Sequence, residues 1–218
     1  ESSRGRSLDC VGTTFGATPA LTRFWGHAGL QPLRLGVRRG TASGSHALLM
    51  LRGLSANGID LVQLASEVFA RNFRSQLADT LTLVPTKVVL EVLGQRVMAP
   101  AMPDIRQWRD VAGFALLGRT YEDVVGSLET TVWWALASEE RSVKLSALCC
   151  DLLVARVLQK RSWTACAELC KASGRAGVLA LLRDGMAKIL EGADVTAVQA
   201  EVLRLQARSI ARSSPSRG

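Results

Sequence analysis

The sequence predicts an α+β fold in which a strand, a helix and a hairpin precede a long region of helices. Two observations favour this class. Residues 8–51 combine β-branched and alternating apolar segments with turn residues, whereas from Ile59 onward apolar residues recur at helical spacing. With 218 residues, 48% of them hydrophobic, the chain can bury either one large core or two small ones.

The first of these segments is expected to begin with a strand and a helix. Residues 8–15 are rich in β-branched and aromatic side chains, which favours a buried strand. Thr18 is expected to cap the helix that starts at Pro19, and Gly29 is expected to end it in a left-handed conformation. The apolar stripe that this helix should turn inward consists of Leu21, Phe24, Trp25 and Ala28.

The rest of the segment is expected to form a β-hairpin. Residues 33–37 alternate between apolar and other side chains, which predicts a strand with Arg34 pointing away from its apolar face. Residues 38–45 form a polar connection that contains glycine, and the apolar residues that follow predict the next strand. Because the connection contains Arg38 and Arg39, it is expected to be a basic loop.

Beyond the hairpin we expect a succession of helices with short breaks. Apolar residues from Ile59 to Leu77 predict one long amphipathic helix, which Pro85 must end or kink, and a short helix is expected over residues 87–93. Residues 97–103 contain two prolines and two methionines and form the best internal linker. The predicted division is residues 1–54 as strand–helix–hairpin, 55–96 as connecting helices, 97–207 as a helical tail domain and 208–218 as a disordered tail.

The tail domain is expected to be an all-α bundle whose helices carry their own start and stop signals. One helix spans residues 104–117 and ends at Gly118, and the next begins after Thr120. Ser138 and Ser162 are the expected N-caps of two later helices. The last helices are expected over residues 175–190 and 195–207, and the expected core includes Trp133, Trp134, Leu148, Cys149, Cys150, Cys166 and Cys170.

The cysteine and histidine content argues against disulfide and zinc chemistry. Five cysteines fit no disulfide framework, and Cys166 and Cys170 are one helical turn apart, which is core spacing. With only two histidines a metal site is not expected, and reduced thiols indicate a cytoplasmic location. The sequence shows no signal peptide and no apolar run near the ~18 residues of a membrane helix, so no membrane partner is expected.

The charge balance indicates an anionic partner. The formal net charge is +8, although charge alone does not separate RNA from DNA or from a membrane surface. With one tyrosine and five phenylalanines, the sequence shows no evident aromatic platform for stacking single-stranded bases.

Six short motifs in a fixed order resemble one known family. They are a threonine-containing strand ending in Phe-Gly, an Arg-Phe-Trp helix, a glycine turn, a Leu-Arg-Leu-Gly strand, a basic Ser-Gly loop and a final apolar strand, at residues 13–16, 23–25, 29–30, 33–36, 38–44 and 47–51. This order resembles the end of the acetyltransferase module, of the GNAT fold, in the tRNA(Met) cytidine acetyltransferase family. Residues 108–128 and 169–190 resemble helical stretches of that family's C-terminal domain.

The resemblance implies an enzyme of which this chain is the C-terminal part. That enzyme acetylates the exocyclic amine (N4) of the wobble cytidine of elongator tRNA(Met), with acetyl-CoA as donor and with ATP hydrolysed by an upstream module. The sequence contains neither an R/Q-x-x-G-x-G/A loop for CoA nor a G-x-x-x-x-G-K-[ST] phosphate loop. Both loops, and the strands that complete the sheet, are therefore expected upstream of Glu1, and the fragment alone is expected to be inactive.

The resemblance also implies two cofactor-binding positions. Ala20 and His27 match positions at which the family carries a glutamate and an arginine that contact the cofactor. Ala20 cannot ionise, and His27 lacks the bidentate fork of arginine, so an exposed histidine in the last helical turn is an equal interpretation. No catalytic base can be named within the chain.

Two basic groups are candidates for binding tRNA. Arg34, Arg38 and Arg39 beside the Gly/Ser-rich loop are expected to grip phosphate or the anticodon loop, with solvated surface arginines as the equal alternative. Lys171 and Arg175 are expected to dock tRNA, although two helices joined near them also allow a helix-turn-helix interpretation. The competing function is a non-catalytic helical adaptor or nucleic-acid-binding module.

Overall fold

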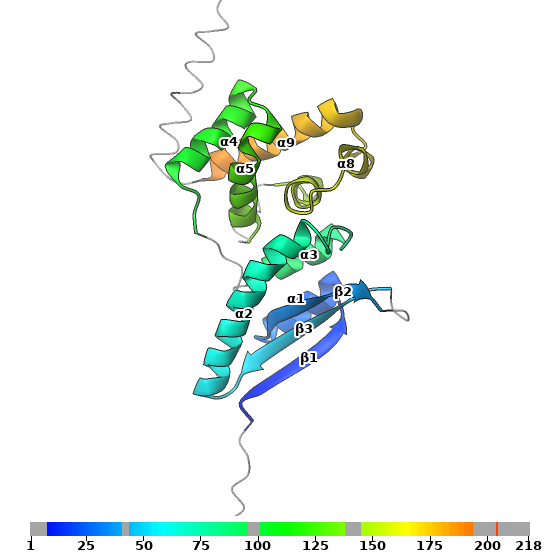
Figure 1. Ribbon diagram of the computed structural model, residues 1–218, viewed down its shortest axis with the longest axis vertical. Helices are drawn as coiled ribbons and strands as arrows, with labels where there is room; N and C mark the ends of the chain where they lie inside the picture. Colours follow the sequence, from blue (N-terminus) through cyan, green and yellow to red (C-terminus); the bar gives the residue numbers. More distant parts are fainter. Residues whose placement is uncertain (1–7, 41–43, 96–100, 138–144, 194–203, 205–218) are drawn as a thin grey trace, which may run out of the picture. The chain divides into compact units, whose positions relative to one another are not determined.

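The computed structural model describes residues 8–40, 44–95, 101–137 and 145–193 together with Arg204. The chain forms two compact units, residues 1–98 and residues 99–218 (Figure 1). Within the described part of the chain, all strands belong to the first unit and the second unit contains helices only. The predicted α+β class is confirmed.

The first unit has the predicted order of strand, helix and hairpin and continues into two helices. Its elements are β1 (Cys10–Gly16), α1 (Pro19–His27), β2 (Gln31–Arg39), β3 (His46–Gly53), α2 (Ala56–Leu77) and α3 (Thr86–Leu93). The Thr18 side chain caps α1 by accepting a hydrogen bond from the backbone N–H of Leu21, as predicted. Gly29, directly after α1, has the predicted left-handed conformation with φ of 82°.

β3 is the central strand of an antiparallel sheet with the order β1-β3-β2. Phe15 of β1 and Leu35 of β2 both lie opposite Leu48, so these three side chains share one face of the sheet. Leu35, Leu48 and Met50 are buried on this face. The hairpin therefore contributes a continuous apolar surface to the core of the unit.

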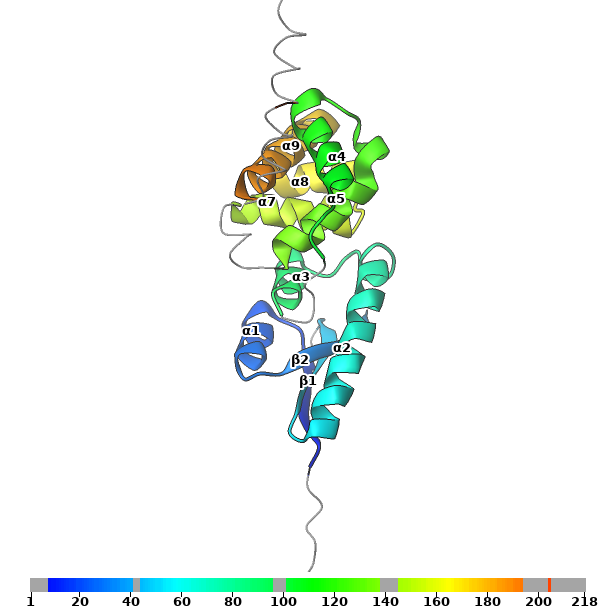
Figure 2. The same cartoon turned by 90° about the vertical axis from the view of Figure 1, so that its left-hand side faces the viewer.

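Helices α1 and α2 lie on opposite sides of the strands (Figure 2). The Cys10 thiol contacts the carbonyl oxygen of Gly58 in α2, whereas Arg52 donates a hydrogen bond to the carbonyl of Ala28 after α1. Cys10 and Arg52 face opposite ways because Arg52 pairs with Val11, the neighbour of Cys10. The buried side of α2 consists of Gly58, Val62, Ser66, Phe69, Phe73 and Leu77.

Several strand boundaries differ from the predicted ones. The first strand begins at Cys10 rather than at Leu8, and β2 extends to Arg39. Arg38 and Arg39 thus belong to a strand, which corrects their prediction as loop residues. Arg39 pairs with His46, so backbone pairing, which the side-chain pattern does not record, sets the end of the hairpin strands.

The predicted inward stripe of α1 is wrong for most of its members. Phe24 is 60% exposed and Leu21 is 41% exposed, Ala28 is exposed as well, and Trp25 is partly buried. Thr22 is the fully buried residue of this helix. Helix α1 packs against α3, a segment far away in the sequence, so the apolar spacing within α1 does not by itself indicate its buried side.

The second unit begins with a helix that ends at Gly118, as predicted. Its elements are α4 (Ile105–Leu117), α5 (Tyr121–Leu136), α7 (Ala147–Leu152), the π-helix η2 (Leu153–Leu158), α8 (Trp163–Cys170) and α9 (Gly174–Gly192). Asp104 and Gln107 form a capping box at the start of α4, and Gly118 ends it in the left-handed conformation. Trp133 and Trp134 are buried, which confirms their prediction as core residues.

The segment around α7 departs from the regular helix that was predicted. Ser146 caps α7, while Ser138 lies outside the described residues. Leu148, expected inside, is 45% exposed. The wider spacing of the π-helix η2, in which Leu153 and Val154 are fully buried, shifts the inward face relative to an α-helix.

Other helix limits of the second unit also differ from the predicted ones or fall outside the described residues. Helix α8 ends at Cys170, where Lys171 adopts a left-handed conformation. Apart from Arg204, the expected helix over residues 195–207 lies outside the described residues, as does the expected disordered tail over 208–218.

Candidate functional site

The three arginines of the hairpin lie on β2, and all three are exposed. Arg34 lies near the middle of the strand, whereas Arg38 and Arg39 are neighbours at its end. The Arg39 guanidinium donates a hydrogen bond of 3.2 Å to the carbonyl oxygen of Leu83. Arg34 and Arg38 form no ion pair with any residue that the structure describes. Arg38 and Arg39 are therefore neighbours along the chain at one end of β2, whereas Arg34 lies further along the strand.

Ala20 and His27 lie two turns apart on one side of α1, and both are exposed. The Ala20 methyl group offers neither a charge nor a hydrogen bond, and His27 lies in the last turn, where the helix dipole favours a positive charge. The sequence also lacks the glycine-containing loop that would bind a pyrophosphate. These residues therefore do not form an acetyl-CoA site by themselves.

A cavity of about 140 Å³ lies beside the end of the hairpin. It is bounded by the turn before α1, the hairpin and the segment leading into α3, and its lining residues are Ala17, Arg39, Gly44, Ser45, His46, Val84, Pro85 and Val88. The backbone N–H of Ala17 donates to the carbonyl oxygen of His46 at 2.7 Å, which joins two of these walls.

His46 is the most constrained polar residue of this cavity. Its side chain is 7% exposed, and its Nδ1 lies 2.7 Å from the carbonyl oxygen of Gly36. Because a carbonyl can only accept, Nδ1 carries a proton and donates it to this hydrogen bond. Nε2 is buried and has no hydrogen-bond partner within the described chain. The sequence gives no sign of this arrangement, since the partner carbonyl lies on the other strand.

In the second unit, one arginine lies between two aromatic rings. The Arg156 guanidinium carbon is 4.1 Å from the centroid of the Trp163 ring and 4.9 Å from that of Tyr121. The Arg175 guanidinium approaches Trp163 at 4.8 Å. Arg156 belongs to the π-helix η2, a rare geometry that is frequent at functional sites. These four residues form a cationic aromatic cluster, which the sequence does not reveal because its members come from four separate segments.

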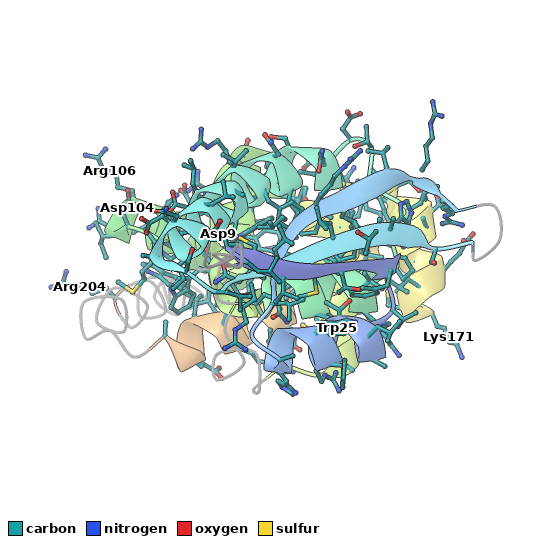
Figure 3. All side chains as sticks on the ribbon, turned by 90° about the horizontal axis from the view of Figure 1, so that it is seen from below. Asp9, Trp25, Asp104, Arg106, Lys171 and Arg204 are labelled. Carbon is teal, nitrogen blue, oxygen red and sulfur yellow. The ribbon has the colours of Figure 1, made fainter. Side chains whose placement is uncertain are left out.

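The basic residues beside this cluster differ in how firmly they are paired. Arg175 pairs with Glu122 at 2.8 Å, and both side chains are more than half exposed, at 53% and 57%. Lys160 pairs with Glu129 at 2.9 Å in a less exposed position. Lys171 is exposed and extends away from the ribbon (Figure 3). Because an exposed ion pair contributes only about 0–1 kcal/mol, a phosphate can readily replace Glu122 beside Arg175.

Burial favours the protonated forms of the Tyr121 phenol and of the Cys149 and Cys166 thiols. It raises the pKa of Tyr121 to about 12 and the pKa of Cys149 to about 11, and it also raises the pKa of the Cys166 thiol. Such thiols are poor nucleophiles and poor metal ligands at neutral pH. Among the described residues, no group of three His, Cys, Asp or Glu side chains is placed to hold a metal ion. None of the described helices is long and apolar enough to cross a bilayer.

Known proteins match both units of the chain. The family described as GNAT acetyltransferase 2 matches residues 1–55, which contain all three strands and α1. A tRNA(Met) cytidine acetyltransferase of Nitrosococcus halophilus is 37% identical over 202 residues, which are 92% of this chain and 27% of that protein. Proteins of the same name from Vibrio cholerae and Thermococcus kodakarensis are 30% and 28% identical over 84% and 77% of this chain, and these matches cover 24% and 21% of their own lengths.

The similarity to these proteins extends over both compact units. The chain belongs to the tRNA(Met) cytidine acetyltransferase family. It spans about a quarter of the length of these relatives. The resemblance inferred from the six motifs is therefore confirmed, and a non-catalytic helical module is not favoured.

The roles of individual residues in this member of the tRNA(Met) cytidine acetyltransferase family stay predictions. Ala20 and His27 are accessible on α1, but their contacts in the structure do not assign them to a cofactor. The tRNA contacts expected of the basic residues of the hairpin and of the second unit stay predictions as well. The predicted limits of the four parts of the chain also stay predictions.

Proposed function

We propose that this chain is the C-terminal part of an enzyme that acetylates the exocyclic amine (N4) of the wobble cytidine of elongator tRNA(Met). The 37% identity to a protein of that name over 92% of the chain carries the proposal. The match to the GNAT acetyltransferase 2 family supports acetyl-CoA as the acetyl donor. The sequence has no G-x-x-x-x-G-K-[ST] loop, so in this proposal a module upstream of this chain binds ATP.

The first unit contributes one wall of the acetyltransferase module in this proposal. Acetyl-CoA supplies the activated acetyl group when it is bound, and the cytidine amine is a weak nucleophile, so the task of this chain is to orient the base. β1 is an edge strand among the described strands, and the exposed side chains of Val11, Leu21 and Phe24 offer apolar surface for further parts of the module. The free cysteines support a cytoplasmic location.

The second unit docks the tRNA in this proposal. The net charge of +8 favours a polyanion, and the weakly paired Arg175 and the exposed Lys171 offer cations for its phosphates. The Trp163 ring between Arg156 and Arg175 adds an aromatic surface beside these cations. Arg34, Arg38 and Arg39 are proposed as further phosphate contacts on the first unit.

The docking role is tested by replacing Lys171 and Arg175 with alanine in the full-length enzyme. Each phosphate contact contributes about 0.7–0.9 to the slope of log affinity against log salt, so the double variant should bind tRNA(Met) more weakly and lose about 1.5 of slope. Filter binding or fluorescence anisotropy between about 50 mM and 200 mM salt measures both quantities.

Lys188 provides a matched control because it is an exposed lysine on α9 that pairs with Asp184 at 2.7 Å. Its replacement by alanine removes the same type of charge and should leave the salt slope near that of the wild type. Glu122→Gln should strengthen binding, because it frees Arg175 from its ion pair. If the Lys171 and Arg175 variants bind tRNA(Met) with unchanged affinity at low and at high salt, the second unit does not dock tRNA through these residues.

A further inference from the structure

The long helix α2 carries a second apolar face on the side that points away from the sheet. The helix packs against β2 and β3, and its buried side includes Val62 and Phe69. On the other side, Leu61, Leu64 and Val68 are 58%, 61% and 45% exposed. No other described helix or strand of the first unit lies along this side of α2 (Figure 2).

These three side chains form one continuous surface, which we call the outer stripe of α2. They follow one another at intervals of three and four residues, so they lie on successive turns of the same helix face. This is the spacing of the seam along which two helices pair. Single apolar residues are common on protein surfaces, whereas a contiguous apolar stripe indicates an interaction site.

Two residues of opposite charge bracket the outer stripe. Asp60 directly precedes Leu61, Arg71 follows Val68 by one turn, and both charged residues are exposed. They lie on the same flank of the stripe, because about three full turns of helix separate them. Neither forms an ion pair with any residue that the structure describes. The surface therefore has an acidic end and a basic end with an apolar middle.

We propose that the outer stripe is an interface with a second copy of this chain, in which the two α2 helices pair in antiparallel orientation. A twofold axis between Leu64 and Val68 places the first half of one helix beside the second half of the other. Asp60 of each copy then lies opposite Arg71 of the other copy. In a parallel pair, Asp60 would meet Asp60 and Arg71 would meet Arg71, so like charges would oppose each other.

The charges are what select a second copy as the occupant. A twofold interface uses the same surface on both sides, so every acid needs a base at the matching distance beyond the centre of the stripe. Asp60 and Arg71 meet this condition. Because the apolar part consists of three side chains, the interface belongs to the small and weak class, and its charged rim sets the orientation of the pair more than its affinity. This inference goes beyond acetylation and does not depend on it.

The test measures the oligomeric state of the full-length protein by sedimentation velocity at increasing protein concentration. The wild type should associate into a dimer. Leu64→Glu buries an unpaired charge at the centre of the interface and should weaken dimerisation by about 100-fold or more. Leu83→Glu is the matched control, because Leu83 is 70% exposed and lies between α2 and α3, and it should dimerise like the wild type.

Charge reversal tests both the orientation and the intermolecular contact. Asp60→Arg or Arg71→Asp alone places like charges at both ends of an antiparallel pair, so each variant should dimerise about 10-fold more weakly than the wild type. In a parallel pair neither substitution would add a repulsion. A mixture of the two variants restores opposite charges at both ends and should dimerise as tightly as the wild type, which native mass spectrometry with one isotope-labelled variant detects.

Thermal unfolding shows whether each variant is folded, and the mixture decides the question if Leu64→Glu does not fold. A wild-type full-length protein that stays monomeric would overturn the inference, including the case in which another part of the same polypeptide covers the outer stripe. A dimer that folded Leu64→Glu leaves intact, or a mixture that dimerises no better than its components, would overturn it as well. The proposed function stands or falls separately, by acetylation of tRNA(Met).

Discussion

Tyr121 provides a direct test of the packing of the second unit, because it is the only tyrosine in the chain. Its ring is 3% exposed and meets the rings of Phe114 and Trp163 edge to face, at 6.2 Å and 5.2 Å between centroids. Burial raises the pKa of its phenol from 10.0 to about 12, and the nearby Arg156 guanidinium only partly opposes that effect. The phenol is therefore held in its protonated form by the fold.

The sign and size of the effect on stability follow from this pKa. Folding favours the protonated phenol, so its contribution is fully present below about pH 10 and is lost as the pH rises through about 12. A difference of two pKa units corresponds to about 2.7 kcal/mol in the free energy of unfolding. We expect a loss of this order, since the ring is almost fully shielded from solvent.

The ultraviolet absorbance of tyrosinate measures the pKa without interference from a second tyrosine. In the folded 218-residue chain its midpoint should lie near pH 12, and in concentrated urea near pH 10. Urea unfolding of the wild type and of Tyr121→Phe at increasing pH measures the contribution of the phenol to the free energy of unfolding. Thiols such as Cys149, whose pKa is about 11, are common to both proteins, so their contributions cancel in the difference. A folded-state midpoint near pH 10 would refute the argument that the ring is desolvated.

Two further predictions concern glycine substitutions and the activity of the isolated chain. Gly58→Ala should destabilise the first unit by about 1–3 kcal/mol in urea unfolding, because the new Cβ would lie 1.8 Å from the carbonyl oxygen of Asp9. At Gly126 no heavy atom would lie within 4 Å of a new Cβ, so Gly126→Ala should instead stabilise α5 by about 0.5–1 kcal/mol. Equal effects of the two substitutions on the free energy of unfolding would contradict the close approach at Gly58. The 218-residue chain alone should neither bind acetyl-CoA tightly nor transfer acetyl groups, since Ala20 and His27 do not form a cofactor site, and measurable acetyl transfer by the purified chain would show that they suffice.

The predictions that held are those in which a short run of residues specifies its own backbone. Thr18 and Pro19 start α1, and Asp104 and Gly118 bound α4, because caps and left-handed glycines act within one turn of the chain. The order of the motifs from Thr13 to Leu51 can likewise be read directly from the sequence, and it was sufficient to find the family.

The candidate site was predicted only in part, because its geometry depends on neighbours from distant segments. Arg39 was recognised as a basic residue, but its hydrogen bond to Leu83 and its place on a cavity rim depend on the segment before α3. The cationic aromatic cluster escaped prediction for the same reason, since Tyr121, Arg156 and Trp163 come from three different helices.

The sequence by itself determined the α+β class, most of the helix starts and the family of this protein, since each depends on local patterns or on the order of residues. Only the tertiary structure decided which side of α1 is buried: Thr22 is buried and Phe24 is exposed, and α1 contacts α3, which lies far away in the sequence. It also decided the orientation of the His46 ring, because the sequence pattern marks this residue only as the start of a strand. The carbonyl of Gly36 across the hairpin accepts a hydrogen bond from Nδ1 of this ring and so orients it.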